Sequence, residues 1–125
     1  MSNSFKSFDN LEAWKQARAM TRNIYQLTAA PELSRDIGLR SQLQRAAVSI
    51  MSNLSEGFER RHVAEKLQLF NIAKGSSAEV RSLLYVIADA YPALTSQATQ
   101  LREQLSQLGG LVYGLHRSTA KRRAE

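Results

Sequence analysis

The sequence predicts an all-α fold, an antiparallel up-down-up-down four-helix bundle. Apolar residues recur at three- and four-residue spacing over four stretches, which is typical of helices that bury one face. Only two prolines, Pro31 and Pro92, interrupt the chain, and each falls between two such stretches. The connecting segments are short, so consecutive helices should run in opposite directions. With 125 residues and no cysteine, the chain is expected to form one domain, residues 1–125, without disulfides.

Two helices are expected in the first half of the chain, over about residues 9–30 and 39–58. Asp9 fits the N-cap of the first helix, and Glu12 stands where it would complete a capping box. Because Pro31 disfavours helix at the residue before it, the first helix should end there. The second helix carries a continuous apolar stripe, made of Leu39, Leu43, Ala46, Ala47, Ile50 and Leu54.

Two more helices are expected in the second half, over about residues 63–90 and 94–116, followed by a frayed basic tail over residues 117–125. Pro92 separates the two helices. The last helix has a heptad seam, in which apolar residues alternate four and three apart without a break. This seam consists of Leu94, Ala98, Leu101, Leu105, Leu108, Val112 and Leu115.

Glycines interrupt the last two helices. Gly109 and Gly110 together cost a helix about 2 kcal/mol relative to alanine, so the fourth helix could end just before them. The heptad seam continues beyond them, and we therefore favour a helix that persists. Gly110 with Gly114, and likewise Gly75, would then let another helix approach closely.

A polar row lies beside the apolar stripe of the second helix. Gln42, Ser49 and Glu56 stand seven residues apart, so they project within about 20° of one another. Arg45 and Asn53 lie on the same edge. An isolated bundle does not need such a row next to its core. The row indicates either a hydrogen-bonded seam between helices or a surface that meets a partner.

The chain is basic, with 17 Lys and Arg against 11 Asp and Glu, a net charge of +6 and a pI near 10.1. Such an excess favours nucleic acid or another polyanion as partner, although it also serves solubility alone. Basic residues alternate with tyrosines, including Tyr85, on faces expected to be exposed, which suits phosphate contacts and stacking on unpaired bases. The residues predicted to bind nucleic acid are Lys15, Arg18, Arg22 and Tyr25 on the first helix, Arg60 and Arg61 in the central turn, Lys74 and Arg81 on the third helix, and Arg117, Lys121, Arg122 and Arg123 in the tail.

Catalytic chemistry has little support in the sequence. The two histidines, His62 and His116, have no second ligand at metal spacing, and no phosphate-binding loop or nucleophile elbow is present. Glu56 with Asn53 could polarise water, but a structural hydrogen-bonded pair is the favoured interpretation. We therefore expect a non-enzyme, with no catalytic residue, no metal, no cofactor and no small-molecule substrate.

The sequence also predicts where the protein resides. No apolar run approaches the ~20 residues of a membrane span, and the N-terminus lacks the apolar stretch of a signal peptide. The absence of cysteine is compatible with a reducing compartment. We expect a cytoplasmic protein with no membrane association.

Two motifs resemble those of a known family. The first is Gln42-x-x-Arg45-Ala46-x-x-Ser49-Ile50-x-x-Asn53-x-x-Glu56-Gly57 with Arg60 and Arg61 after it, and the second is Phe70-x-x-Ala73-x-Gly75-Ser76-x-x-Glu79. With Trp14 ahead of them, they are similar to the small bacterial four-helix-bundle proteins encoded within intervening sequences of the large-subunit ribosomal RNA gene. The resemblance covers about residues 5–115. Ser55 and Ser77 depart from it, because an apolar residue is common at both positions.

The resemblance implies an assembly and a set of motif positions. Characterised members form homopentameric barrels, and a related branch, the accessory variability proteins of diversity-generating retroelements, binds nucleic acid and a reverse transcriptase. The family has no agreed catalytic residues. The motif positions, expected to be structural or to lie at subunit contacts, are Gln42, Arg45, Ser49, Asn53, Glu56, Gly57, Gly75, Ser76 and Glu79.

Two functional hypotheses follow. The leading one is a non-enzymatic homo-oligomeric scaffold, a pentamer, that binds RNA or DNA through basic stripes, as accessory to a reverse transcriptase or to an element associated with ribosomal RNA. The alternative is a protein-only assembly module, in which the charge serves solubility. The two are compatible, because assembly could create the binding surface.

Overall fold

The computed structural model describes residues 7–124, with side chains through Arg122, and this part of the chain contains helices and no strand. Four long helices make up most of it: α1 (Glu12–Thr28), α3 (Ile37–Glu59), α4 (Val63–Ala90) and α5 (Thr95–Ala124). The connectors contain the 3-10 turns η1 (Phe8–Asn10) and η2 (Pro92–Leu94) and the one-turn helix α2 (Pro31–Ser34). The predicted all-α class is confirmed.

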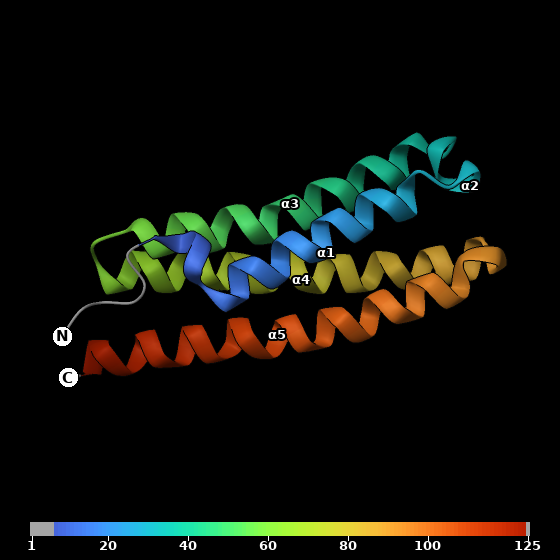
Figure 1. Cartoon of the computed structure of the whole chain (residues 1–125). Coiled ribbons are helices and arrows are strands. Elements are labelled where there is room, and N and C mark those ends of the chain that lie inside the picture. Colours follow the sequence, from blue (N-terminus) through green and yellow to red (C-terminus); the bar gives the residue numbers. More distant parts are fainter. Residues whose placement is uncertain (1–6, 125) are drawn as a thin grey trace.

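The four long helices form an elongated bundle in which consecutive members run in opposite directions (Figure 1). Both α1 and α4 adjoin α3 and α5, so α1 lies diagonally across the bundle from α4. η1 and the last turns of α5 lie at the same end of the bundle as the turn between α3 and α4 (Figure 1).

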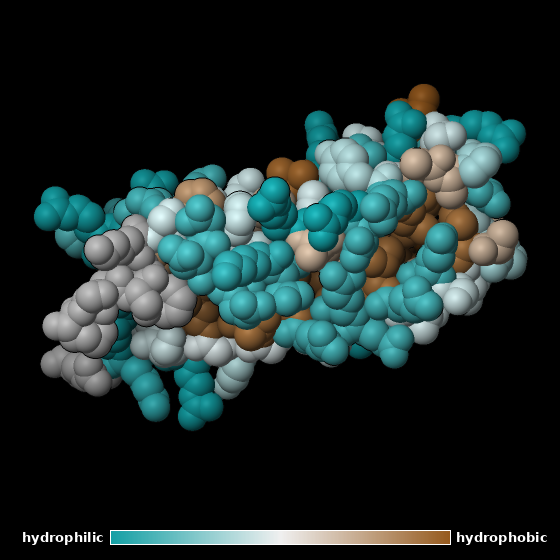
Figure 2. All heavy atoms as spheres, in the orientation of Figure 1, coloured by the Kyte–Doolittle hydropathy of each residue, from teal (hydrophilic) through white to brown (hydrophobic). Residues whose placement is uncertain are grey.

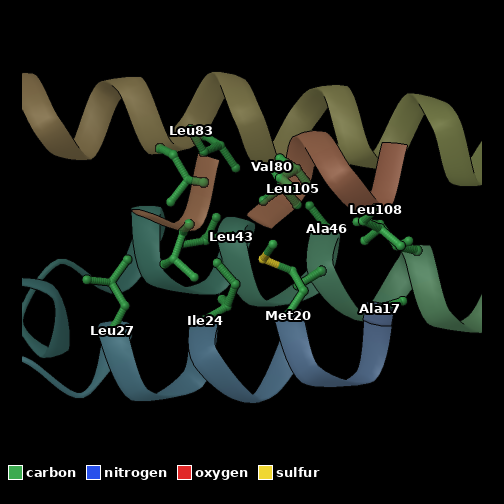
Figure 3. Packing of buried hydrophobic residues seen from close by; sticks show 14 of the residues in the cluster. Ala17, Met20, Ile24, Leu27, Leu43, Ala46, Val80, Leu83, Leu105 and Leu108 are labelled. Atoms are coloured by element: carbon green, nitrogen blue, oxygen red, sulfur yellow. The ribbon is translucent and has the colours of Figure 1, made fainter. Parts of the chain in front are cut away.

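One apolar cluster runs through the centre of the bundle, and every long helix contributes to it. Figure 3 shows Met20 and Ile24 of α1 facing Leu43 of α3, with Val80 of α4 and Leu105 of α5 closing the space. The predicted heptad seam of α5 is buried along almost its whole length. Burial of a side chain of this size contributes about 1.5–3 kcal/mol, so this cluster is what holds the four helices together.

The start of the first helix differs from the prediction. Asp9 does not cap it with a side-chain bond; instead Asp9 lies within η1, and α1 begins at Glu12. Leu11 stands between the two with extended backbone angles (φ −73°, ψ 129°) and is 7% exposed. Burial of Leu11 therefore decides the local backbone, and the ring of Phe8 packs edge-on against Trp14 with centroids 5.1 Å apart.

The connector between α1 and α3 is also more ordered than the sequence predicts. Pro31 occupies the first turn of α2, where its missing N–H removes no bond that a helix needs. Asp36 then caps α3, because its side chain accepts a hydrogen bond from the backbone N–H of Leu39 at 3.3 Å. As a result α3 starts at Ile37, ahead of the predicted start at Leu39.

The predicted frayed tail is wrong for the part of it that the structure describes. The helix continues through Gly109 and Gly110, as favoured above, and then on to Ala124. Thr119 is 2% exposed, so the buried face of α5 extends one turn beyond Leu115. Lys and Arg are good helix formers, and the buried Thr119 packs the last turns of α5 against the bundle, so the basic segment stays helical.

Within this chain the close helix contact occurs at Gly57, and not at Gly75, Gly110 or Gly114, where the sequence predicted it. A Cβ built on Gly57 would stand 2.6 Å from Cε1 of Phe70, so α3 and α4 approach closely only because residue 57 has no side chain. At Gly75, Gly110 and Gly114 such a Cβ meets no atom of the described chain within 4 Å. No other helix of the chain uses the space at these three positions.

The molecular surface is mostly hydrophilic over α1, while apolar atoms of the core remain visible in the seam between α1 and α5 (Figure 2). Asn23 and Gln104 bridge this seam with a side-chain hydrogen bond of 2.9 Å. Over the described residues, no helix combines the length and the apolar character that crossing a membrane requires.

Candidate nucleic-acid interface

Three of the predicted basic residues come together on α1. Lys15, Arg18 and Arg22 are exposed and line one hollow of about 460 Å³, whose single acidic lining residue is Asp9. The Arg18 guanidinium lies 6.0 Å from the ring centroid of Trp14. A cation at this distance from an aromatic face is weakly attracted to it, so Trp14 helps to hold Arg18 at the hollow. The hollow, called here the α1 hollow, presents three cations to one ligand.

Tyr25 lies apart from that hollow, although it belongs to the same helical stripe. Its side chain is 47% exposed and borders a different hollow of about 380 Å³ between α1 and α3, together with Arg45 and Val48. Arg45, predicted as a motif residue, is thus an exposed cation next to a tyrosine. The structure brings Arg45 and Tyr25 together, although the sequence analysis assigned Arg45 to the motif positions and Tyr25 to the nucleic-acid-binding residues.

A second basic surface lies between α4 and α5, in a groove of about 740 Å³. Lys74 and Arg81 line it, as does the half-exposed Tyr85. Arg102 of α5 completes it, with its guanidinium carbon 4.1 Å from the centroid of the Tyr85 ring. We call this surface the α4/α5 groove.

Sequence reasoning missed Arg102. The residue stands beside the heptad seam on the side of α5 that faces α4, and α5 there shows no run of positive charge. One signal was present in the sequence. Arg102 and Tyr113 are eleven residues apart on α5, and Lys74 and Tyr85 are eleven residues apart on α4, a spacing that brings each pair to one face of its helix. Their pairing across two helices depends on the register of α4 against α5.

Of the two cations predicted in the central turn, Arg60 has carboxylates close to it. Arg60 and Arg61 are exposed, as predicted. Arg60, however, borders a hollow of about 310 Å³ that it shares with Glu56 and Glu59. Two carboxylates beside one guanidinium reduce its attraction for phosphate.

The basic residues of the predicted tail lie on the last turns of α5. Arg117, Lys121 and Arg122 are exposed there, and the side chain of Arg123 lies outside the described residues. A lysine that the predictions did not include lies close by: Nζ of Lys66 donates to the carbonyl oxygens of Phe58 at 2.7 Å and Gly57 at 3.3 Å. This lysine caps the C-terminal end of α3, where a cation also meets the negative end of the helix dipole.

Burial lowers the pKa of Lys66, the nearby positive charge of Arg122 lowers it further, and Glu59 opposes both effects. The basic end of α5 therefore acts electrostatically on the turn between α3 and α4, although the two are far apart in the sequence.

The polar row of α3 forms hydrogen bonds within the chain. The hydroxyls of Ser49 and Ser76 are 2.7 Å apart, and Nε2 of Gln42 donates to a carboxylate oxygen of Glu79 at 3.4 Å. The side-chain amide of Asn53 donates to the hydroxyl of Ser49 at 3.1 Å and to its backbone oxygen at 2.8 Å. Gln42 and Ser49 thus form a seam between α3 and α4, which is the first of the two interpretations that the sequence left open, whereas Arg45 of the same row lies exposed beside Tyr25.

Glu56 stands outside this seam. It is exposed, and the hollow that it borders also contains Phe8 and Arg60 but not Asn53, whose amide is taken up by Ser49. Across residues 7–124, no three acidic or histidine side chains gather closely enough to hold a metal ion.

Comparison with known proteins adds a family to this geometry. The sequence profile of the 23S rRNA-intervening sequence protein family matches residues 9–114. The chain belongs to this family. The matched range contains α1, α3, α4, both motifs and α5 as far as residue 114, so the family match extends over most of the bundle.

Solved structures support the fold of this family member. A crystal structure of a protein with unknown function from the S23 ribosomal protein family of Bacteroides thetaiotaomicron superposes with a TM-score of 0.75. The two chains are 15% identical, and the match covers 83% of this chain and 97% of the other. At that identity the likeness shows the fold alone. Among curated proteins, none matches the sequence.

Proposed function

We propose that the chain is a non-enzymatic homo-oligomeric scaffold that binds RNA or DNA through phosphate contacts. The observation that carries the proposal is the α1 hollow, where Lys15, Arg18 and Arg22 surround one space next to a single carboxylate. Arg and Lys are the side chains that most often contact phosphate oxygens, and such contacts need no base-specific geometry. Three cations around one hollow suit a polyanion better than they suit solubility, which a dispersed charge would serve equally well.

Two further facts favour nucleic acid among polyanions. Aromatic rings accompany the cations, with Trp14 beside Arg18 and Tyr85 beside Arg102, and rings of this kind can stack on unpaired bases. The family name associates its members with 23S rRNA, and this association favours RNA as the polyanion. More specifically, the proposed scaffold acts with an element associated with ribosomal RNA or as an accessory to a reverse transcriptase.

The scaffold is proposed to act as a homopentamer, the assembly that the resemblance implies. Exposed apolar side chains on α4 support a subunit contact, since Ile72 and Val86 are each 45% exposed on one side of that helix. The open space at Gly75 lies on the same side. Repetition of the α1 hollow around a ring would turn weak phosphate contacts into avid binding.

A protein-only assembly module is the second candidate. Arg60 favours it, because this cation lies beside Glu56 and Glu59 and is thus partly neutralised within the chain. In this alternative the subunits contact one another through the same face of α4, and the basic charge keeps the oligomer in solution.

A triple variant separates the two candidates. Lys15→Glu, Arg18→Glu and Arg22→Glu together reverse the charge of the α1 hollow, and we expect single-stranded RNA or DNA to bind at least about tenfold more weakly. Arg35→Glu is the matched control, an exposed arginine next to α2 whose loss should change affinity little. The helical circular dichroism signal and the sedimentation mass should stay the same in both variants. An unchanged affinity in the triple variant would overturn the assignment of this hollow.

A further inference from the structure

The α4/α5 groove contains one cation–aromatic pair, and a second pair adjoins it, in which Lys74 lines the groove and Tyr113 lies next to the lining residue Val112. Arg102 of α5 lies over the ring of Tyr85 of α4 at 4.1 Å, and Lys74 of α4 lies 5.8 Å from the ring centroid of Tyr113 of α5. In one pair α5 supplies the cation and α4 the ring, and in the other α4 supplies the cation and α5 the ring, an arrangement that the antiparallel helices allow. On each helix eleven residues separate the cation of one pair from the ring of the other, which amounts to about 16 Å along the helix axis.

The space between the pairs is hollow because its residues are small. Gly109 of α5 and Ser77 of α4 are among them, and a Cβ built on Gly109 would meet no atom of the described chain within 4 Å. The groove holds about 740 Å³, within the range of sites that take a ligand of several rings. Its length and volume suit a few successive nucleotides of one strand and are too small to enclose a duplex.

The charge of the groove points to an anion. Lys74, Arg81 and Arg102 line it against one carboxylate, that of Glu103. Nη1 of Arg102 is buried and has no hydrogen-bond partner among the described residues. A buried cationic donor without an acceptor is costly, so a shift of the Arg102 side chain that brought Nη1 to an anionic oxygen in the groove would be favourable.

The tyrosines supply the complementary apolar surface. Tyr85 is 47% exposed and Tyr113 is 55% exposed, although each already has a cation near its ring. Exposed rings next to cations are the combination by which proteins hold unpaired nucleotides, since bases stack on rings while phosphates bind the charges. A duplex hides the faces of its bases and offers nothing to these rings.

From this arrangement we propose that the α4/α5 groove binds a short run of unpaired nucleotides, with phosphates on Lys74, Arg81 and Arg102 and bases against Tyr85 and Tyr113. The inference rests on the proposed nucleic-acid function and adds to it a place and a preference for single strands. It assigns the α1 hollow to general phosphate attraction and the α4/α5 groove to the recognition of unpaired strand.

Filling the groove tests the proposal without any change of charge. Gly109→Leu places a side chain in the open space of the groove, and Gly110→Leu is the matched control, because Gly110 has equally open space but does not line the groove. Both changes replace a helix glycine with a better helix former, so neither should unfold the protein. Affinity is measured by fluorescence anisotropy with a labelled oligothymidylate, and with a duplex of the same length.

We expect Gly109→Leu and Arg102→Gln each to weaken binding of the single strand about tenfold while duplex binding changes little, and Gly110→Leu to match the wild type. Equal affinity of Gly109→Leu and Gly110→Leu for the single strand would overturn the groove proposal. If the wild type binds the single strand and only the reversed α1 hollow loses it, the groove proposal fails and the nucleic-acid function stands. If the wild type binds neither strand type, both fail.

Covalent mapping gives an independent readout. An oligonucleotide carrying 5-iodouridine, irradiated in the complex, should cross-link to Tyr85 or Tyr113, and mass spectrometry of the digested protein locates the adduct. Adducts confined to Trp14 or Tyr25 would place the bases elsewhere and contradict the proposal.

Discussion

The hydroxyls of Ser49 on α3 and Ser76 on α4 lie 2.7 Å apart, and the amide of Asn53 donates to the same Ser49 oxygen at 3.1 Å. Each of the three side chains is half-buried, next to the fully buried Ile50 and Ala73. The seam therefore joins two helices through a polar network where the core would otherwise be apolar. Such a network fixes which residues of the two helices face each other, because a shift of one residue would leave its donors without acceptors.

Removal of both hydroxyls of this network should cost less than the sum of the two separate removals. Ser49→Ala leaves the Ser76 hydroxyl without its partner, while Asn53 keeps its bond to the backbone oxygen of residue 49, and we expect the change to lower the free energy of unfolding by about 1–2 kcal/mol. In Ser49→Ala with Ser76→Ala, one unpaired hydroxyl fewer remains, so the double variant should lose less than the sum of the two single variants. Urea unfolding of all four proteins measures the coupling. Strict additivity would show that the two hydroxyls do not interact.

Gly57 should resist substitution, whereas Gly75 should tolerate it. Alanine gains up to about 1 kcal/mol over glycine in a helix, but at Gly57 its Cβ would stand 2.6 Å from the buried ring of Phe70. Overpacking of this kind costs about 1–3 kcal/mol, so Gly57→Ala should be destabilising on balance. Gly75→Ala meets no atom of its own subunit within 4 Å and should stabilise the separate subunit by up to about 1 kcal/mol. Thermal unfolding compares the two, and a stabilised Gly57→Ala would show that α4 can move away.

The contact between Tyr91 and Asp36 should give stability that depends on pH. The phenol of Tyr91 donates to Oδ2 of Asp36 at 2.7 Å, and this hydrogen bond is the main reason why the pKa of Tyr91 is raised above its usual 10.0, with burial adding to it. A raised pKa in the folded state means that the stabilisation is complete below about pH 10 and is lost as the pH rises through the raised value. Tyr91→Phe should therefore unfold more readily than the wild type at neutral pH, and the difference should shrink in alkali.

Urea unfolding from neutral pH to about pH 11 measures this difference, with Tyr25→Phe as the exposed-tyrosine control. A difference that is constant over this range would mean that the hydrogen bond contributes nothing to stability.

The outer face of α4 should decide the oligomeric state. Ile72→Glu with Val86→Glu replaces two exposed apolar side chains by charges, which a subunit contact could not bury without a partner. We expect a smaller sedimentation mass with unchanged helical content. A glutamate pair on the neighbouring helix, Gln97→Glu with Gln100→Glu at exposed positions of α5, is the matched control and should keep the wild-type mass. Equal masses of all three proteins would show that α4 does not form the contact.

Much of the fold could be predicted because periodicity specifies which face of a helix is buried. The heptad seam of α5 and the bounds of α4 follow from it. Periodicity says less about helix ends: Leu11 leaves the helical conformation because its side chain enters the core, and Thr119 extends α5 because it lies over the core. Both depend on tertiary contacts that the local sequence does not contain.

The candidate site was predictable within each helix but not between helices. Lys15, Arg18 and Arg22 follow from the spacing on α1, and the structure does place them in one hollow. The pairing of Arg102 with Tyr85 depends on how far α5 slides along α4, a register set by core packing. Spacing along one chain segment carries no information about that register.

The salt dependence of binding tests the central claim most directly. The affinity of the assembled protein for single-stranded RNA, measured by fluorescence anisotropy over a range of salt concentrations, should fall linearly on a double-logarithmic plot. For a single strand each phosphate contact contributes a slope of about −0.7, so engagement of the α1 hollow alone predicts a slope of about −2. Absence of binding at low salt, or an affinity independent of salt, would contradict the account and leave the basic charge without a nucleic-acid role.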